Sequence, residues 1–263
     1  METRGLFSDE RADLLAFFRG LAASDWAATS PAPGWLVKDV ALHLLDGDLS
    51  RLSRGRDGDP TGVLPKGADS AAFARMLGVR NQRWIEATRH LSGRVIADAL
   101  AHSTAQLDDW TSGVDLRSPS FVSWASDDPV PAWLDLAREL AETWVHHQQI
   151  RAAVGRPTST ARLPTVLRTF VWALPHQYRV LAEPGTAVAI DLDAGGRWRL
   201  LAVGTGRWTL EEDASRDADA SVSFTSDAAW RSFTGAALPA NGVRQSGPDA
   251  LTTPVLKIRG IIA

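Results

Sequence analysis

The chain has 263 residues and a formal net charge of −3, and its composition is 44% hydrophobic and 22% charged. These values are typical of a globular protein long enough for two domains. The small negative charge argues against nucleic acid or an anionic membrane surface as a partner. The absence of cysteine excludes disulfides, cysteine nucleophiles and cysteine-ligated zinc.

The N-terminal segment METRGLFSDE is charged from its second residue and has no basic stretch followed by an apolar one, so we expect no signal peptide. No apolar run reaches the roughly 20 residues that a membrane span needs. We therefore expect a cytoplasmic protein, a monomer or homodimer, without a membrane partner.

Apolar residues recur near a 3.6-residue period through the first half of the chain, which predicts amphipathic helices. Gly- and Pro-containing loops separate them, and Gly155 and Pro157 close the last one. We expect helices at 8–28, 36–53, 69–91, 93–112 and 131–154. Several antiparallel helices with apolar stripes predict a bundle, which we place at residues 1–157.

The pattern changes after about residue 184 to short alternating segments rich in β-branched and aromatic residues, separated by Gly-rich turns. We expect a helix at 162–182, strands within 186–196, 197–206, 207–213 and 220–227, and helices at 227–236 and 247–262. Strands followed by helices predict a small α+β domain at 158–263. The whole chain is therefore expected to be an α+β protein with two domains.

The segment RELAETWVHHQQIRAAVGRP, residues 138–157, places Glu142 and His146 four positions apart. Side chains at this spacing lie about 5–6 Å apart on one helix face. Apolar neighbours flank the pair, so we expect it to face the protein interior. His147 is rotated by roughly 100° and is expected to face another side.

A third polar group, His43, is isolated in the apolar stretch of DVALHLLDGD, residues 39–48. With Glu142 and His146 it would form a set of two histidines and one carboxylate from two helices. Such a set suits zinc with an open coordination position, or non-haem Fe(II). The same residues would also be explained as hydrogen-bonded core histidines and an i,i+4 pair, and the spacing alone leaves both interpretations open.

The segment GWLVKDVALHLLDGD, residues 34–48, and the segment 138–157 together resemble the two signature helices of the mycothiol-dependent maleylpyruvate isomerase family. The resemblance covers essentially the whole chain. It implies an N-terminal DinB-like four-helix bundle and a C-terminal α+β domain related to sterol-carrier-like folds. It also implies that His43, Glu142 and His146 bind a divalent metal, with Zn²⁺ as the expected ion, and that mycothiol is the cosubstrate.

Two further positions are read from this resemblance. Gln149 stands where the family often has Asp, and we expect it to orient a metal ligand from outside the coordination sphere. The segment VRNQRW matches an Arg-Asn pair near the pocket of the isomerases, so Arg80 is a candidate catalytic residue that binds an anion. A solvated arginine on a helix surface is the alternative.

The chain departs from the isomerases in its second domain. Ala236 follows Gly235 where the isomerases have an arginine next to a glycine. Arg231, one turn earlier, is a candidate replacement that would bind the cosubstrate. This departure favours a reaction with a less charged substrate than a dicarboxylate.

Because the chain has no cysteine, any reacting thiol must come from a small cosubstrate. We expect Trp35 and Trp144 to line its binding site, together with Arg80, in a cleft between the domains. The first hypothesis is metal-dependent conjugation of mycothiol to an electrophile. The alternatives are maleylpyruvate-type cis–trans isomerisation, a non-catalytic metal-containing protein that binds a small apolar ligand, and hydrolysis by zinc-bound hydroxide.

Overall fold

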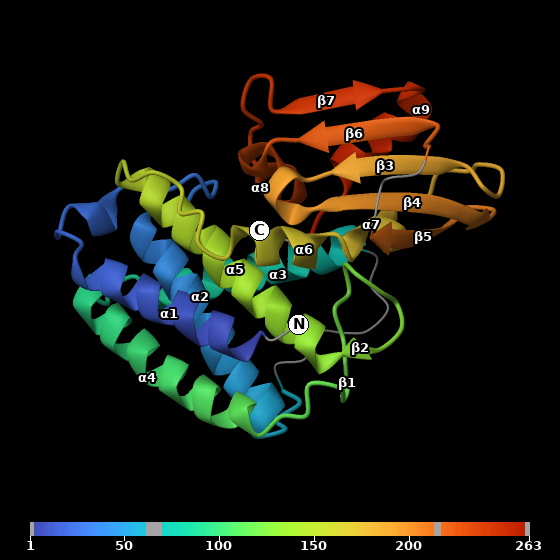
Figure 1. Cartoon of the computed structure of the whole chain (residues 1–263). Helices are drawn as coiled ribbons and strands as arrows, with labels where there is room; N and C mark the ends of the chain where they lie inside the picture. The colour runs from blue at the N-terminus through green and yellow to red at the C-terminus, as the bar shows by residue number, and fades with distance from the viewer. Residues whose placement is uncertain (1–2, 62–69, 213–216, 261–263) are drawn as a thin grey trace. The chain divides into compact units, whose positions relative to one another are not determined.

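The computed structural model describes residues 3–61, 70–212 and 217–260 of the chain. Helices predominate in the first half, and a five-stranded sheet with short helices follows in the second half (Figure 1). The expected α+β class, with the helical part first, is confirmed. Among the described residues, no helix combines the length and the apolar content needed to cross a bilayer.

Tertiary contacts divide the chain into two compact units. Unit 1 contains residues 1–115 and 142–159, and unit 2 contains residues 116–141 and 160–263. Residues 116–141 thus group with the second unit, whereas the sequence placed them in the first domain. Compactness alone does not define a folding domain, so the boundary at 157/158 stays a prediction.

Unit 1 is built from helices that enclose one apolar core. Their bounds are α1 (Arg4–Arg19), α2 (Val37–Arg51), α3 (Ser70–Thr88), α4 (Gly93–Ser112) and α5 (Ala132–Ala153), of which residues 142–153 belong to this unit. Helical periodicity brings together the buried core residues Leu14, Phe18, Val40, Leu44, Ile85, Ile96, Leu100 and Ile150. The first helix ends sooner than expected, because the chain leaves the helix at Gly20 and forms only a 3₁₀ turn at Asp25–Ala27.

The start of α2 is fixed by a buried carboxylate. Asp39 accepts a hydrogen bond from the backbone N–H of Leu36 at 2.9 Å and two from Arg89, from Nε at 2.9 Å and Nη2 at 2.7 Å. Burial raises the pKa of Asp39, but the hydrogen bonds from Arg89 and Leu36 outweigh it and hold that pKa below its usual value. This cap sets where α2 begins, and therefore where His43 lies one turn later.

Unit 2 is organised by a sheet with the strand order β5-β4-β3-β6-β7. The strands are β3 (Ala187–Asp191), β4 (Arg197–Gly204), β5 (Arg207–Glu212), β6 (Ala220–Phe224) and β7 (Val243–Ser246). The pair β3–β6 is parallel and the other neighbours are antiparallel. Every second residue of β6 is buried, which matches the period of two expected for a sheet with one covered face. A two-stranded sheet, β1 (Pro119–Ser120) and β2 (Val130–Pro131), completes the strands described in this unit.

Three segments of unit 2 differ from the expectation. The helix expected at 162–182 is interrupted, giving α6 (Leu163–Phe170) and α7 (Ala173–Gln177), because Pro175 lacks the N–H that would continue the helix. Within residues 247–260, the expected C-terminal helix is likewise reduced to α9 (Asp249–Thr252) and a 3₁₀ turn (Thr253–Lys257), and its last two expected residues, 261 and 262, lie outside the described residues. Strand β7 was not expected, whereas α8 (Ser226–Thr234) was.

Candidate metal centre

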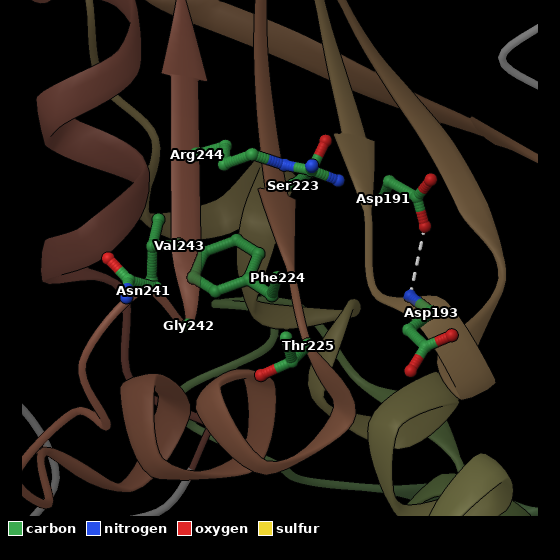
Figure 2. Close-up of a pocket in the computed structure, with 9 residues that line it drawn as sticks. All are labelled: Asp191, Asp193, Ser223, Phe224, Thr225, Asn241, Gly242, Val243 and Arg244. Carbon is green, nitrogen blue, oxygen red and sulfur yellow. Dashed lines mark hydrogen bonds between the residues drawn. The ribbon is translucent and has the colours of Figure 1, made fainter.

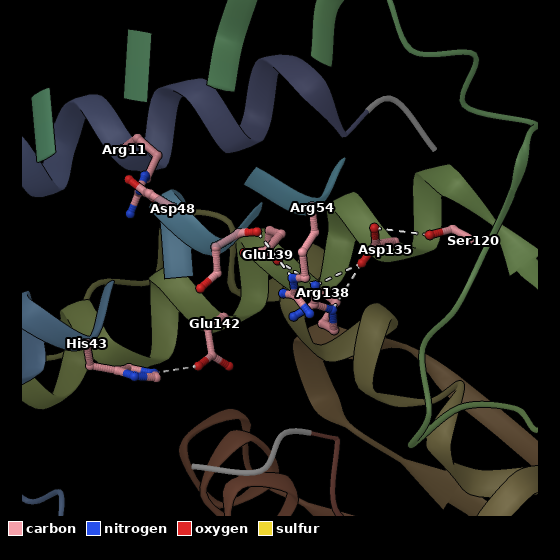
Figure 3. A network of polar contacts seen from close by, with 10 residues as sticks. Arg11, His43, Asp48, Arg54, Ser120, Asp135, Arg138, Glu139 and Glu142 are labelled. Atoms are coloured by element: carbon pink, nitrogen blue, oxygen red, sulfur yellow. Dashed lines mark hydrogen bonds and ion pairs between the residues drawn. The ribbon is translucent and has the colours of Figure 1, made fainter. Parts of the chain in front are cut away.

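Three side chains of unit 1 bring one potential ligand atom each to a common point. His43 lies on α2, and Glu142 and His146 lie one turn apart on α5. Oε1 of Glu142 is 3.2 Å from Nε2 of His43 (Figure 3). The same oxygen is 3.2 Å from Nε2 of His146. The three ligand atoms all lie within 4.8 Å of one another. The structure therefore brings together the three residues that the sequence singled out.

The burial of these side chains is uneven. The side chain of His146 is 2% exposed, whereas those of His43 and Glu142 are 17% and 20% exposed. One side of the cluster is thus packed against the core and the other remains accessible. This arrangement suits an ion that keeps a coordination position open for a small molecule.

Hydrogen bonding determines which nitrogen of His146 is free to bind a cation. Nδ1 of His146 donates to the amide oxygen of Gln149 at 2.8 Å. Nε2 of the same ring faces Oε1 of Glu142 at 3.2 Å, so Nε2 is the nitrogen left to bind a cation. Gln149 thus contacts His146, and its role in orienting a metal ligand stays a prediction.

The negative charge of Glu142 favours a cation at this cluster. Burial raises the pKa of Glu142, but the hydrogen bonds to His146 and His43 outweigh it and hold that pKa well below its usual range. The carboxylate is thus anionic near neutral pH and can serve as a cation ligand. Nδ1 of His43 is also buried and has no hydrogen-bond partner among the described residues. A divalent cation between the three ligand atoms would be bound by Nε2 of both histidines and by the carboxylate, so the residues present fit a metal.

His147, the neighbour of His146, faces a different side of α5, as the sequence predicted. Its Nδ1 donates to Oε1 of Glu10 at 2.7 Å, and its ring packs edge-on against Phe17. It is only 3% exposed. This partner could not be identified from the sequence, because Glu10 is 137 residues away in the chain and looks like an ordinary charged residue of the first helix.

The two tryptophans expected near the cosubstrate lie in different surroundings. Trp35 is half-buried, and its ring centroid is 5.1 Å from that of His43. Trp144 is fully buried. Trp35 therefore has the better position for contact with a molecule bound at the cluster, and a lining role for either residue stays a prediction.

The two candidate arginines both have acidic neighbours. Arg80 on α3 pairs with Asp46 at 3.4 Å and also donates to Ser50. Arg231 on α8 donates to Asp227 at 2.9 Å, and its guanidinium lies 4.7 Å above the ring of Trp230. Part of each positive charge is thus offset within the protein, and the anion-binding roles of both arginines stay predictions.

A positively charged side chain, Arg259, lies next to Gly235, and the sequence did not predict it. A Cβ placed on Gly235 would lie 3.1 Å from Nε of Arg259, so the guanidinium of Arg259 is next to this glycine. Nη1 of Arg259 donates to three backbone carbonyls at 2.9–3.0 Å. The bond to Ser232 links the C-terminal segment to α8, so Arg259 has a structural role there.

Unit 2 contains a separate hollow of about 560 Å³ at the ends of β3 and β6 and the start of β7 (Figure 2). Its lining includes two carboxylates, Asp191 and Asp193, and the guanidinium of Arg244. None of the predicted site residues lines it. This hollow is therefore distinct from the histidine–carboxylate cluster in both position and composition.

The chain is similar to one protein family and to two solved structures. A family model described as the N-terminal domain of mycothiol maleylpyruvate isomerase matches residues 7–151. No curated protein matches the chain. Two solved structures, of the mycothiol-dependent maleylpyruvate isomerase and of a histidine-to-alanine mutant, align with a TM-score of 0.58 and 15% identity over 93% of this chain and 92% of theirs. At this identity the likeness shows a common fold.

Proposed function

Because the chain belongs to the family defined by the N-terminal domain of mycothiol maleylpyruvate isomerase, we propose that it is a metal-dependent enzyme that activates a small thiol. The observation that carries the proposal is the convergence of His43, Glu142 and His146, whose ligand atoms lie within 4.8 Å of one another. We assign these three residues as the ligands of one divalent cation, with Zn²⁺ as the expected ion. His147 is not assigned as a ligand because its Nδ1 is bonded to Glu10.

When bound, the cation would stabilise the thiolate form of a coordinating thiol near neutral pH. The chain's own residues supply the rest of the site. Gln149 holds the imidazole of His146 so that Nε2 faces the ion. The accessible side of His43 and Glu142 leaves space for the thiol, and the ring of Trp35 offers an apolar surface beside His43.

The thiol itself must be a cosubstrate, because the chain contains no cysteine. The family description and the two similar structures both refer to mycothiol, and we propose mycothiol as this thiol. The other substrate is an electrophile that accepts the thiolate sulfur.

We favour S-conjugation as the reaction on grounds of charge. A dicarboxylate substrate is best held by paired arginine forks. Here Arg80 is paired with Asp46, and Ala236 stands next to Gly235 where an arginine would add a second fork. A less charged electrophile requires only the activated thiol and an apolar contact surface.

Maleylpyruvate-type isomerisation is the second candidate, and the family match favours it. The same thiolate would add to the cis double bond, which becomes a single bond that can rotate, and elimination would then re-form the double bond in the trans form and release the thiolate. Both candidates therefore share the metal site and the cosubstrate, and they differ in how the carboxylates of the substrate are bound.

The test starts from full-length protein purified without chelator or nickel resin, and its metal content is measured by elemental analysis. The protein loaded with zinc is then given mycothiol with either a bimane electrophile or maleylpyruvate. Conjugation with slow or absent isomerisation is the expected result. Fast isomerisation without conjugation reverses the order of the two candidates. A third outcome would indicate a binding protein instead. In that case the purified protein contains no metal, shows no thiol-dependent activity and binds an apolar ligand tightly.

A further inference from the structure

Two adjacent residues of α1 each bury a charge against a helix that carries the candidate ligands. Glu10 is 2% exposed and Arg11 is 1% exposed. Adjacent residues of a helix point in directions about 100° apart. One helix can therefore reach two different neighbours through consecutive side chains.

Glu10 binds α5. Its Oε1 accepts a hydrogen bond from Nδ1 of His147 at 2.7 Å. His147 directly follows His146, so this bond fixes both the rotation of α5 and its position along the axis at the residue next to a candidate ligand.

Arg11 binds α2. Its guanidinium forms an ion pair with Asp48, which is 5% exposed and lies on the same helix as His43 (Figure 3). Asp48 also accepts a hydrogen bond of 2.6 Å from the hydroxyl of Ser103 on α4. The far end of α2 is thus tied to both α1 and α4.

Stability alone is a poor explanation for this arrangement. Removing two charges from water costs several kcal/mol per ion, and apolar residues of similar volume often replace a buried pair without loss of stability. Nε and Nη1 of Arg11 are buried without a hydrogen-bond partner among the described residues, which adds to the cost. Buried pairs of this kind are best known for setting the register between helices.

The candidate site depends on such a register. His43 comes from α2, whereas Glu142 and His146 come from α5, so the spacing of their ligand atoms is determined by how these two helices pack. We infer that Glu10 and Arg11 are positioning residues: they hold α5 and α2 in the register that keeps His43 within reach of Glu142 and His146. The inference rests on the proposed metal site.

The first experiment separates positioning from stability. Full-length wild type and Arg11→Met/Asp48→Leu are compared, with Arg19→Met at an exposed position of α1 as the control. The melting temperature is measured without metal, and the dissociation constant and absorption spectrum are measured with Co²⁺, whose visible bands depend on ligand geometry. We expect the double variant to melt near the wild type, to bind Co²⁺ about ten-fold more weakly, and to show an altered spectrum. A folded double variant with wild-type affinity and spectrum overturns the inference.

The second experiment uses the other pair and remains decisive if the double variant does not fold. Glu10→Gln keeps an oxygen that accepts from His147, whereas Glu10→Leu does not, and Asp9→Asn at an exposed position is the control. We expect wild-type Co²⁺ affinity in Glu10→Gln and an affinity about ten-fold weaker in Glu10→Leu. Equal affinity in both overturns the inference while leaving the metal site intact. A wild type that binds neither Co²⁺ nor Zn²⁺ overturns the proposed function itself.

Discussion

Nδ1 of His146 donates a hydrogen bond to the amide oxygen of Gln149, three residues further along α5, at 2.8 Å. This bond holds the imidazole so that Nε2 faces the point where Glu142 and His43 converge. An amide orients the ring but cannot raise its basicity as a carboxylate does. The strength of the metal site should therefore respond to changes at Gln149 without any change in the ligands.

We expect Gln149→Leu to weaken zinc binding about ten-fold, and Gln149→Glu to strengthen it. The leucine removes the acceptor that holds His146, whereas the glutamate adds negative charge behind it. Competition titration with a zinc chelator measures both effects. Gln82→Leu, at an exposed position of α3, is the control. Equal zinc affinity in all the variants would mean that Gln149 does not orient a ligand.

The ligand assignment predicts which histidines determine metal content. We expect His43→Ala and His146→Ala to lose most of the bound zinc, because either change leaves only two of the three ligands. His102→Ala should retain the wild-type content, since this exposed histidine lies on α4 outside the cluster. Elemental analysis of the purified variants checks the assignment, and undiminished zinc in His146→Ala would contradict it.

A change at Arg80 should raise KM only for substrates that carry a carboxylate. If Arg80 binds a substrate carboxylate, Arg80→Gln removes a hydrogen bond to a charged group worth roughly 1.5 kcal/mol, which raises KM about ten-fold. KM for an uncharged electrophile should not change. Arg83→Gln, at an exposed position of the same helix, is the control. An equal effect on both electrophiles would indicate that the pair with Asp46 is structural.

The contribution of Asp39, which caps the start of α2, to the free energy of unfolding should depend on pH. Hydrogen bonds from Arg89 and Leu36 hold the pKa of Asp39 below its ordinary value of 3.8, despite burial that raises it. A depressed pKa means that the stabilisation is fully present above pH 3.8 and is lost as pH falls through the folded-state pKa. We expect Asp39→Asn to destabilise the protein at pH 7 and to differ less from the wild type at pH 3. Denaturant unfolding at both pH values tests this, and a constant difference would exclude a charge effect.

The sequence predicted the parts of the structure that depend on local spacing. Glu142 and His146 share a face because they are four residues apart on a helix, and His43 was conspicuous because its neighbours are apolar. Strand β7 escaped notice because it is a short edge strand with mostly exposed residues, so it lacks the apolar alternation of β6.

Side-chain contacts between residues far apart in the chain could not be predicted from the sequence. Nothing in the local pattern connects Glu10 with His147 or Arg11 with Asp48, because these partners meet only after the helices pack. The same holds for Arg80, whose partner Asp46 lies 34 residues away in the chain. The break between α6 and α7, one turn before Pro175, and the 3₁₀ turn that contains Pro254 could in contrast be predicted, because proline lacks the N–H that an α-helix needs.

Removal of the metal should lower the melting temperature and leave the fold intact. A ligand that binds only the folded state stabilises it by about 2.7 kcal/mol when present at 100 times its dissociation constant. For a chain of this size, that corresponds to a decrease of roughly 5–10 °C on chelation. The helical circular dichroism should persist, because the apolar core around Leu14, Val40 and Ile150 does not depend on the ion. Differential scanning calorimetry with and without chelator gives the shift, and zinc added back should restore it. His146→Ala should show no shift with chelator. An unchanged melting temperature in wild type after verified metal removal would place the bound ion outside the core cluster.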